Sequence, residues 1–164
     1  MMTYTAGIIT ASDKGAIGQR EDVSGMVIKE ILEAHGFDVV KYSLLPDEFI
    51  ELSDEMVLMA DDLKVNLILT TGGTGFSKRD ITPEATKSVI IRETPGICEA
   101  IRAYSMTITK RAMLSRAVSG IRGETLIINL PGSPKAVRES LDYIIDSLEH
   151  GLDILLALDS DCAR

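Results

Sequence analysis

Residues 66–75 read NLILTTGGTG and join a short apolar run directly to three glycines within four positions. The run at 66–70 predicts a β-strand that is buried on both faces. Glycines tolerate positive φ and let a ligand approach the backbone, so consecutive N–H groups of this loop can bind an anion. The stretch therefore predicts a buried strand that ends in a phosphate-binding loop, with a ligand-free tight turn as the alternative. The loop residues expected at the ligand are Thr71, Gly72, Gly73, Thr74 and Gly75.

The alternation of short apolar runs and helical periodicity continues on both sides of this stretch. Further strands are predicted at residues 5–10, 38–44, 117–121 and 125–129. Helices are predicted at residues 24–35, 48–63, from 82 onward, 96–109, 134–150 and 152–158, with Ser24 and Thr82 as N-caps. Strands that are apolar throughout pair in parallel and are covered by helices on both faces. We therefore expect an α/β fold, a three-layer α/β/α sandwich with a mostly parallel central sheet, formed by residues 1–164 as one domain.

Unusual residues gather in four loops that follow predicted strands. In a parallel sheet, the loops after the carboxyl ends of the strands share one edge, and ligands bind at that edge. We therefore expect all four loops to meet there. They are residues 12–14 (SDK), 46–48 (PDE), 71–80 (TGGTGFSKRD) and 130–134 (LPGSP).

Two aspartates in these loops are candidates for holding a metal ion. Asp80 ends the glycine loop, and Asp47 follows Pro46 after the second predicted strand. Carboxylates beside a phosphate site can hold Mg²⁺ against the phosphates. The alternatives are structural, because either acid can stabilise the start of the helix that follows it, and capping is the better explanation of Asp47 alone. Two aspartates that face one phosphate pocket favour a metal site.

The loop around Ser133 offers a second anion site. Pro131, Gly132 and Ser133 lie just before a helix, so the loop presents a hydroxyl and open amides at the positive end of the helix dipole. A rigid helix-entry turn explains the same residues equally well. Ser12 contributes a hydroxyl from the first strand-end loop, where a solvated turn is an equal alternative.

Composition excludes several classes of function. The charged residues sum to 17 − 25 = −8, and Trp is absent, so nucleic acid and anionic membranes are poor partners. The glycine loop is neither a P-loop nor a dinucleotide-binding fingerprint. Cys98 and Cys162 are isolated, which argues against zinc, and Cys98 is expected to be a buried reduced thiol. No signal peptide or membrane-spanning run is evident, so a cytoplasmic protein is expected.

At these loops the sequence resembles the MogA/MoaB-type molybdopterin adenylyltransferases, a family related to the gephyrin G domain. The resemblance covers nearly the whole chain. Lys78 and Phe76 depart from it, since the common form of the glycine loop has proline and leucine there. The matching segments are 70-TTGGTG-75, 79-RDITPEAT-86, 94-TPGI-97, 114-LSRA-117 and 130-LPGSPKA-136.

The resemblance implies transfer of AMP from ATP to the terminal phosphate of molybdopterin, with release of pyrophosphate, during molybdenum cofactor biosynthesis. It implies that Asp80 is the catalytic aspartate and Asp47 the second acidic site residue. The glycine loop and the Ser133 loop correspond to the phosphate-binding and pterin-binding loops. A homotrimer is implied as well, and the molybdate-insertion protein of the same pathway is an expected partner.

Two other functions fit the same motifs. A pterin carrier or scaffold without turnover would keep the glycine loop and need neither aspartate. A nucleotide pyrophosphatase, similar to the competence-damage proteins, would use water as the acceptor in place of the pterin.

Overall fold

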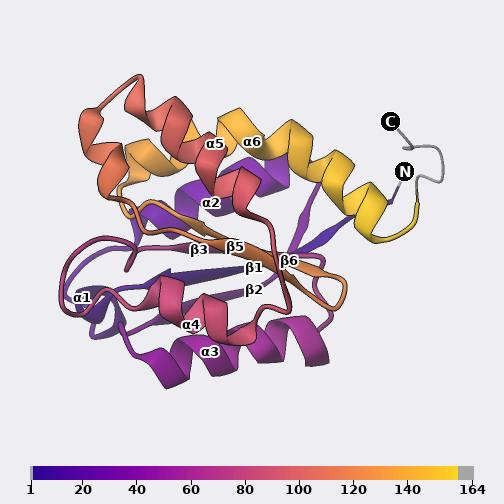
Figure 1. The fold of residues 1–164 in the computed structure, drawn as a ribbon. Coiled ribbons are helices and arrows are strands. Elements are labelled where there is room, and N and C mark those ends of the chain that lie inside the picture. Colours follow the sequence, from indigo (N-terminus) through magenta and orange to yellow (C-terminus); the bar gives the residue numbers. More distant parts are fainter. Residues whose placement is uncertain (1, 159–164) are drawn as a thin grey trace.

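A six-stranded sheet forms the centre of the molecule, and its strand order is β2-β1-β3-β6-β5-β4 (Figure 1). The computed structural model describes residues 2–158, and Cys162 lies outside this range. Strands β2, β1, β3 and β6 run in parallel, whereas β5 is antiparallel to β6 and β4 is antiparallel to β5. The strands are β1 (Thr5–Ala11), β2 (Asp38–Leu45), β3 (Leu67–Thr71), β4 (Arg92–Glu93), β5 (Ser119–Arg122) and β6 (Thr125–Leu130).

Helices cover both faces of this sheet. Helices α2, α5 and α6 lie on one face and α3 and α4 on the other, with α1 at the end of β1 (Figure 1). The α-helices are α1 (Asp13–Ala16), α2 (Val23–Ala34), α3 (Phe49–Val57), α4 (Thr82–Val89), α5 (Pro95–Met106) and α6 (Pro134–Leu155). A π-helical turn, Leu58–Asp62, extends α3, and a 3₁₀-helix covers Lys110–Leu114.

The central strands are almost entirely buried because successive side chains enter two different cores. Ile8 packs into the core shared with α2, α5 and α6, whereas Ile9 packs into the core shared with α3 and α4. All five residues of β3 and all six of β6 are buried. The predicted three-layer α/β/α sandwich with a mostly parallel sheet is confirmed.

Both predicted N-caps are wrong, and tertiary contacts explain why. Asp22 caps α2 by accepting the Gly25 N–H at 3.0 Å, while the Ser24 hydroxyl donates to the Gly132 carbonyl oxygen at 2.7 Å. Thr82 lies inside the first turn of α4, and its backbone N–H donates to the Gly73 carbonyl oxygen at 3.1 Å. Both residues thus connect a helix start to a neighbouring loop.

The C-terminal part of the prediction also changes. The sequence predicts a break near residue 150, but α6 runs without interruption to Leu155, because Leu148 and Leu152 continue the same buried face. The expected short helix at 152–158 is therefore the end of α6. Strand β5 starts at Ser119 rather than at 117, and the two-residue strand β4 has no signal in the sequence.

The remaining structural expectations concern Cys98 and membranes. Cys98 is a free, buried cysteine on the face of α5 that packs into the core, as predicted. Within residues 2–158, no helix combines the length and the apolar character needed to cross a membrane.

Candidate active site at the carboxyl edge of the sheet

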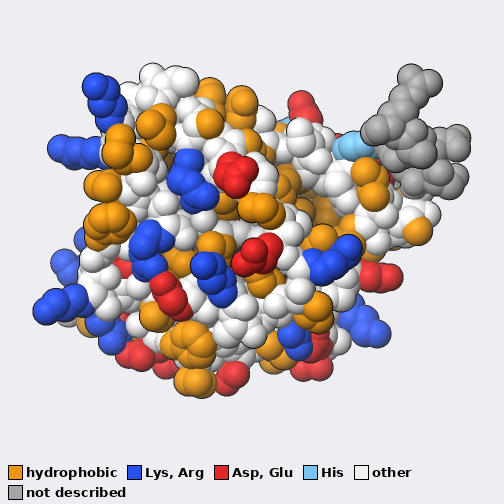
Figure 2. All heavy atoms as spheres, viewed as in Figure 1, with side chains coloured by type: hydrophobic (Ala, Val, Ile, Leu, Met, Phe, Trp, Pro, Cys, Tyr) orange, Lys and Arg blue, Asp and Glu red, His pale blue; other side chains and the backbone are white. Residues whose placement is uncertain are grey.

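A cavity of about 610 Å³ lies at the carboxyl edge of the parallel strands, within the size range of small-molecule sites. All four strand-end loops contribute to its lining, as expected from the topology. Figure 2 shows Lys and Arg side chains gathered along the edge of the molecule where Figure 1 places α1. The predicted site residues that line the cavity are Ser12, Asp47, Thr71, Gly72, Gly73, Asp80, Gly132 and Ser133.

The glycine loop turns sharply after β3 and needs glycine at two positions. Gly72 has φ +89° and Gly73 has φ +69°, a region that other residues rarely adopt. A Cβ atom on Gly72 would lie 2.3 Å from the Ala11 carbonyl oxygen, which belongs to the backbone of the neighbouring strand end. The loop therefore packs tightly on the end of β1 and presents backbone to the cavity.

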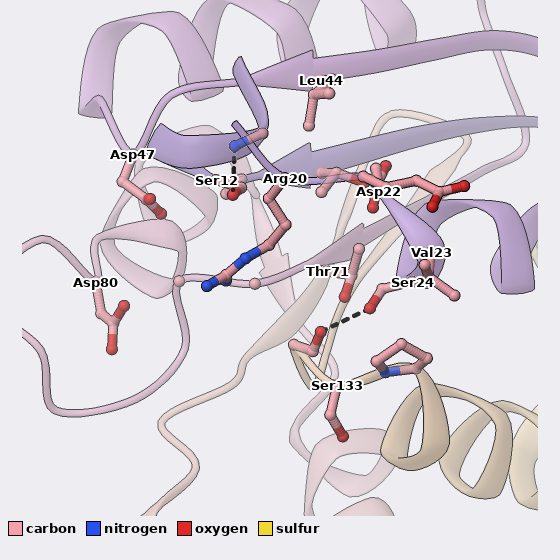
Figure 3. Close-up of a pocket in the computed structure, with 18 residues that line it drawn as sticks. Ser12, Arg20, Asp22, Val23, Ser24, Leu44, Asp47, Thr71, Asp80 and Ser133 are labelled. Atoms are coloured by element: carbon pink, nitrogen blue, oxygen red, sulfur yellow. Dashed lines mark hydrogen bonds between the residues drawn. The ribbon is translucent and has the colours of Figure 1, made fainter. Parts of the chain in front are cut away.

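Hydroxyl groups join the glycine loop to the Ser133 loop. The buried Thr71 hydroxyl donates to the Pro131 carbonyl oxygen at 2.6 Å, so its side chain braces the loops rather than projecting freely into the cavity. The Ser24 hydroxyl makes the equivalent bond to the Gly132 carbonyl oxygen (Figure 3). The start of α2 thereby holds the Ser133 loop from the other side.

Asp47 presents one bare carboxylate oxygen. Its Oδ2 accepts the Asp13 N–H at 3.1 Å, and its own N–H donates to the Asp13 carboxylate at 3.0 Å. Its Oδ1 is buried and has no hydrogen-bond partner among the described residues. Burial, more than the nearby carboxylates of Asp13 and Asp80, raises the pKa of Asp47 above its usual value. Asp47 does not cap α3, so the preferred structural alternative for this residue is wrong.

Arg79 holds the partner of Asp47 in position. Its guanidinium donates two hydrogen bonds to Asp13, at 3.0 and 2.9 Å, and a third to Glu48 at 2.8 Å. The hydrogen bonds from Arg79 are the main cause of the lowered pKa of Asp13. Arg79 thus connects the glycine loop to the loops after β1 and β2, and indirectly orients Asp47.

Asp80 closes the turn that returns from the glycine loop to α4. Its Oδ2 accepts the Ser77 N–H at 3.0 Å, and α4 has no side-chain cap, so Asp80 stabilises this turn and not the helix start. A Cβ atom on Gly75 would lie 2.9 Å from the same Oδ2. Asp80 projects from the loop on the side of the cavity where Asp47 lies (Figure 3).

Two long helices start at the cavity wall. Val23 and Ser24 at the start of α2 line it, as do Ser133 and Pro134 at the start of α6 (Figure 3). The Ser133 hydroxyl caps α6 by accepting the Ala136 N–H at 3.2 Å. The positive ends of both helix dipoles therefore favour a bound anion.

Three predicted ligand-binding residues lie outside the cavity lining. Thr74 is buried, and its carbonyl oxygen accepts the Arg116 N–H at 2.8 Å. The Gly75 carbonyl oxygen accepts the Arg116 Nε–H at 2.7 Å, and the Pro131 carbonyl oxygen is the partner of Thr71. The backbone carbonyl groups of these three residues therefore stabilise the loops that surround the cavity.

The segment 20–24 is part of the lining and was missed by the sequence analysis. Its sequence, REDVS, runs from the first strand-to-helix connection into the first turn of α2, at the same sheet edge as the other loops. Its position at this edge could have identified the segment as part of the site. Ser12, by contrast, was predicted, and its hydroxyl caps the short helix α1 by accepting the Gly15 N–H at 3.0 Å.

A divalent cation fits the acidic side of this cavity. Within residues 2–158, no group of three or more Asp, Glu, His or Cys is arranged to hold a metal ion alone. Mg²⁺ commonly uses one or two carboxylates and takes its other ligands from water and substrate phosphates. The bare Oδ1 of Asp47 lies close to Gly73, since a Cβ atom on Gly73 would be 3.0 Å from that oxygen. A substrate phosphate bound at Gly72 and Gly73, the glycine turn within the glycine loop, would share a cation with this oxygen.

The fold and this cavity define an α/β protein whose candidate site, at the carboxyl edge of its sheet, contains the two aspartates Asp47 and Asp80. Residues 7–150 match the family described as a probable molybdopterin binding domain. The chain belongs to this family, and it is related to molybdopterin adenylyltransferases and to gephyrin.

Three similar proteins support the assignment. A molybdopterin adenylyltransferase of Helicobacter pylori J99 is 39% identical over 158 residues, covering 95% of this chain and 90% of the relative. Gephyrin of Dictyostelium discoideum is 42% identical over 162 residues, covering 93% of this chain and 22% of that longer protein. The crystal structure of the molybdopterin biosynthesis enzyme MoaB from Thermus thermophilus superimposes with a TM-score of 0.89 at 45% identity, covering 94% of this chain and 98% of that one.

Proposed function

We propose that this protein is a molybdopterin adenylyltransferase, which transfers AMP from ATP to the terminal phosphate of molybdopterin and releases pyrophosphate. The observation that carries the proposal is the bare, buried oxygen of Asp47 beside a glycine turn. Asp80 lies on the same side of the cavity, and two helix N-termini form the opposite wall. A carrier of the pterin would need the glycine turn but would gain nothing from a buried carboxylate oxygen left without a partner.

The reaction is an in-line nucleotidyl transfer. A terminal phosphate oxygen of molybdopterin attacks the α-phosphorus of ATP, the new P–O bond forms, and the bond to the bridging oxygen of pyrophosphate breaks. The attacking oxygen is already an anion at neutral pH, so no general base is needed. The protein has to align two polyanions and reduce the repulsion between them.

The residues of this chain divide that work. Asp47 and Asp80 would hold Mg²⁺, which supplies positive charge at the reacting phosphates. The glycine turn offers backbone N–H groups to the phosphates, and the starts of α2 and α6 add the positive ends of their dipoles. Arg79 and Asp13 orient Asp47 without lining the cavity.

The proposal is tested by incubating the protein with ATP, Mg²⁺ and molybdopterin and analysing the products by mass. The expected product is adenylylated molybdopterin together with pyrophosphate. Nucleotide cleavage that proceeds equally well without pterin would favour the pyrophosphatase. Binding of pterin with no AMP transfer in the presence of ATP and Mg²⁺ would favour the carrier.

We also propose a homotrimer, with the molybdate-insertion protein of the same pathway as a further partner. Exposed apolar side chains at the end of α5 and on the 3₁₀-helix support self-association, since single small domains rarely leave such groups together in solvent. They are Met106, Ile108, Met113 and Leu114.

A further inference from the structure

The cavity contains four carboxylates and one basic side chain. Glu21, Asp22, Asp47 and Asp80 line it, and Arg20 is the sole lysine or arginine among the lining residues. Asp22 is already engaged, because it accepts the Gly25 N–H and the Tyr42 hydroxyl. A substrate that carries several phosphate charges would meet strong repulsion in this cavity unless cations offset it.

Arg20 is placed to offset that charge. Its side chain extends into the cavity, toward the wall that carries Asp47 and Asp80 and across from Ser133 (Figure 3). Unlike Arg79, which is held by Asp13 and Glu48, Arg20 has no hydrogen bond or ion pair with any described residue. Its five N–H donors are therefore available to a ligand, and a guanidinium group matches the geometry of phosphate oxygens.

We propose that Arg20 is a substrate-binding residue that donates hydrogen bonds to a phosphate group held on the glycine turn. The inference rests on the proposed function and adds to it a cationic side chain at the cavity, where the glycine and Ser133 loops place no lysine or arginine. The phosphate belongs to either the nucleotide or the pterin, and the two are separated by measuring each. Arg20 enters from the connection between β1 and α2, so it approaches the phosphate from the side opposite the Ser133 loop.

The first experiment measures binding without turnover. Calorimetry compares the Arg20→Gln protein with the unaltered protein, using inorganic pyrophosphate, an α,β-methylene ATP analogue that cannot transfer AMP, and molybdopterin. We expect affinity for at least one phosphate ligand to fall by about tenfold or more, as expected for a lost charge-assisted hydrogen bond. Arg20→Lys should recover part of the loss, because it restores the charge without the planar donor geometry. Weakening of the analogue alone identifies the nucleotide phosphate, and weakening of molybdopterin alone identifies the pterin phosphate.

Arg138→Gln is the matched control, because it removes a guanidinium that pairs with Glu30 at 3.2 Å and does not line the cavity. It should bind all three ligands as the unaltered protein does. Steady-state kinetics should show that Arg20→Gln raises the KM of the affected substrate more than it lowers kcat. A folded Arg20→Gln protein with unchanged affinity for all three ligands would overturn the proposal, as would an unaltered protein that binds none of them. An unaltered protein that binds pyrophosphate through Arg20 but makes no adenylylated pterin would contradict only the proposed function.

Discussion

At the scale of single residues, Asp80 combines a structural contact with a role in the proposed reaction, and the two can be separated. Asp80→Asn keeps an oxygen that can accept the Ser77 N–H, so the turn should survive. The charge needed to hold Mg²⁺ is lost, and we expect AMP transfer to fall by a factor on the order of a hundred or more. Single-turnover AMP transfer with matched melting curves tests this. Full activity in a folded Asp80→Asn protein would exclude Asp80 from the metal site.

Replacing Asp47 is expected to lower AMP transfer more than the position of Asp47 in the sequence indicates. If Asp47 only capped a helix, Asp47→Asn would cause a mild loss of AMP transfer. Asp47 caps no helix, however, and it presents a buried oxygen without a hydrogen-bond partner. We expect a loss of AMP transfer comparable to that of Asp80→Asn, with an unchanged or higher melting temperature, because an uncompensated buried charge is removed. The same two measurements apply. A lower melting temperature with normal turnover would mean that Asp47 is structural.

The Glu84–Arg116 pair gives the protein a testable pH dependence. Arg116 holds the Gly75 and Asp80 carbonyl oxygens, and its hydrogen bond to Glu84 lowers the pKa of Glu84 below its usual 4.5. A lowered carboxyl pKa stabilises the fold above the unfolded-state pKa, and that stabilisation is lost as pH falls through the folded-state pKa. Glu84→Gln should therefore melt below the unaltered protein at pH 7 and show a shrinking difference below about pH 4.5. A difference that does not change with pH would contradict the pair.

At the scale of elements, the two glycines of the turn after β3 exclude a side chain for different reasons. A Cβ on Gly72 would meet the Ala11 backbone oxygen at 2.3 Å, whereas one on Gly73 would meet the Thr82 Oγ1 at 2.3 Å and the Asp47 Oδ1 at 3.0 Å. Gly72→Ala should therefore destabilise the fold, by about 1–3 kcal/mol from the φ strain alone. Gly73→Val should weaken phosphate binding and also strain the turn.

Gly132→Ala is the control for the glycine turn. Its Cβ would meet nothing closer than 3.6 Å, which is ordinary contact, so stability should be kept. Thermal melts and calorimetry with pyrophosphate compare the three variants. A Gly73→Val protein that binds pyrophosphate normally would remove the turn from the binding site.

The start of α6 combines capping with ligand binding at Ser133. Ser133→Ala removes the acceptor for the Ala136 N–H and should destabilise the protein by about 1 kcal/mol. Ser133→Asp keeps a cap of similar quality but adds a negative charge at the cavity wall. We expect the aspartate variant to melt normally and to bind pyrophosphate much more weakly. Normal binding by this variant would place the substrate phosphates away from α6.

At the scale of the whole molecule, the proposed homotrimer predicts the mass of the protein in solution. Sedimentation analysis at micromolar concentration should give three times the 17.8 kDa mass of the chain. Met113→Lys places a charge among the exposed apolar side chains near α5 and should weaken association if they form the interface. A monomer at micromolar concentration would contradict the trimer.

The fold could be predicted from sequence where local patterns and burial agree. Runs such as residues 125–129 are mostly apolar because both sheet faces are covered, and this composition can be recognised in the sequence alone. The sequence-based prediction was wrong where tertiary contacts decide the structure: it expected a break in α6 and did not predict strand β4. Burial of Leu152 keeps the helix continuous through Gly151, and two residues pair as β4 only because β5 lies beside them.

The sequence by itself determined the α/β class, the glycine turn and the gathering of four loops at one edge, because periodicity and parallel topology follow from local composition. The tertiary structure alone decided which side chains line the cavity. Thr71 and Ser24 donate their hydroxyl groups to carbonyl oxygens of the Ser133 loop, which is distant from both in sequence. Asp13 and Arg79 orient Asp47 from separate loops and leave its Oδ1 bare. Hydrogen-bond partners are chosen by proximity in space, and proximity between separate loops is a property of the packed fold.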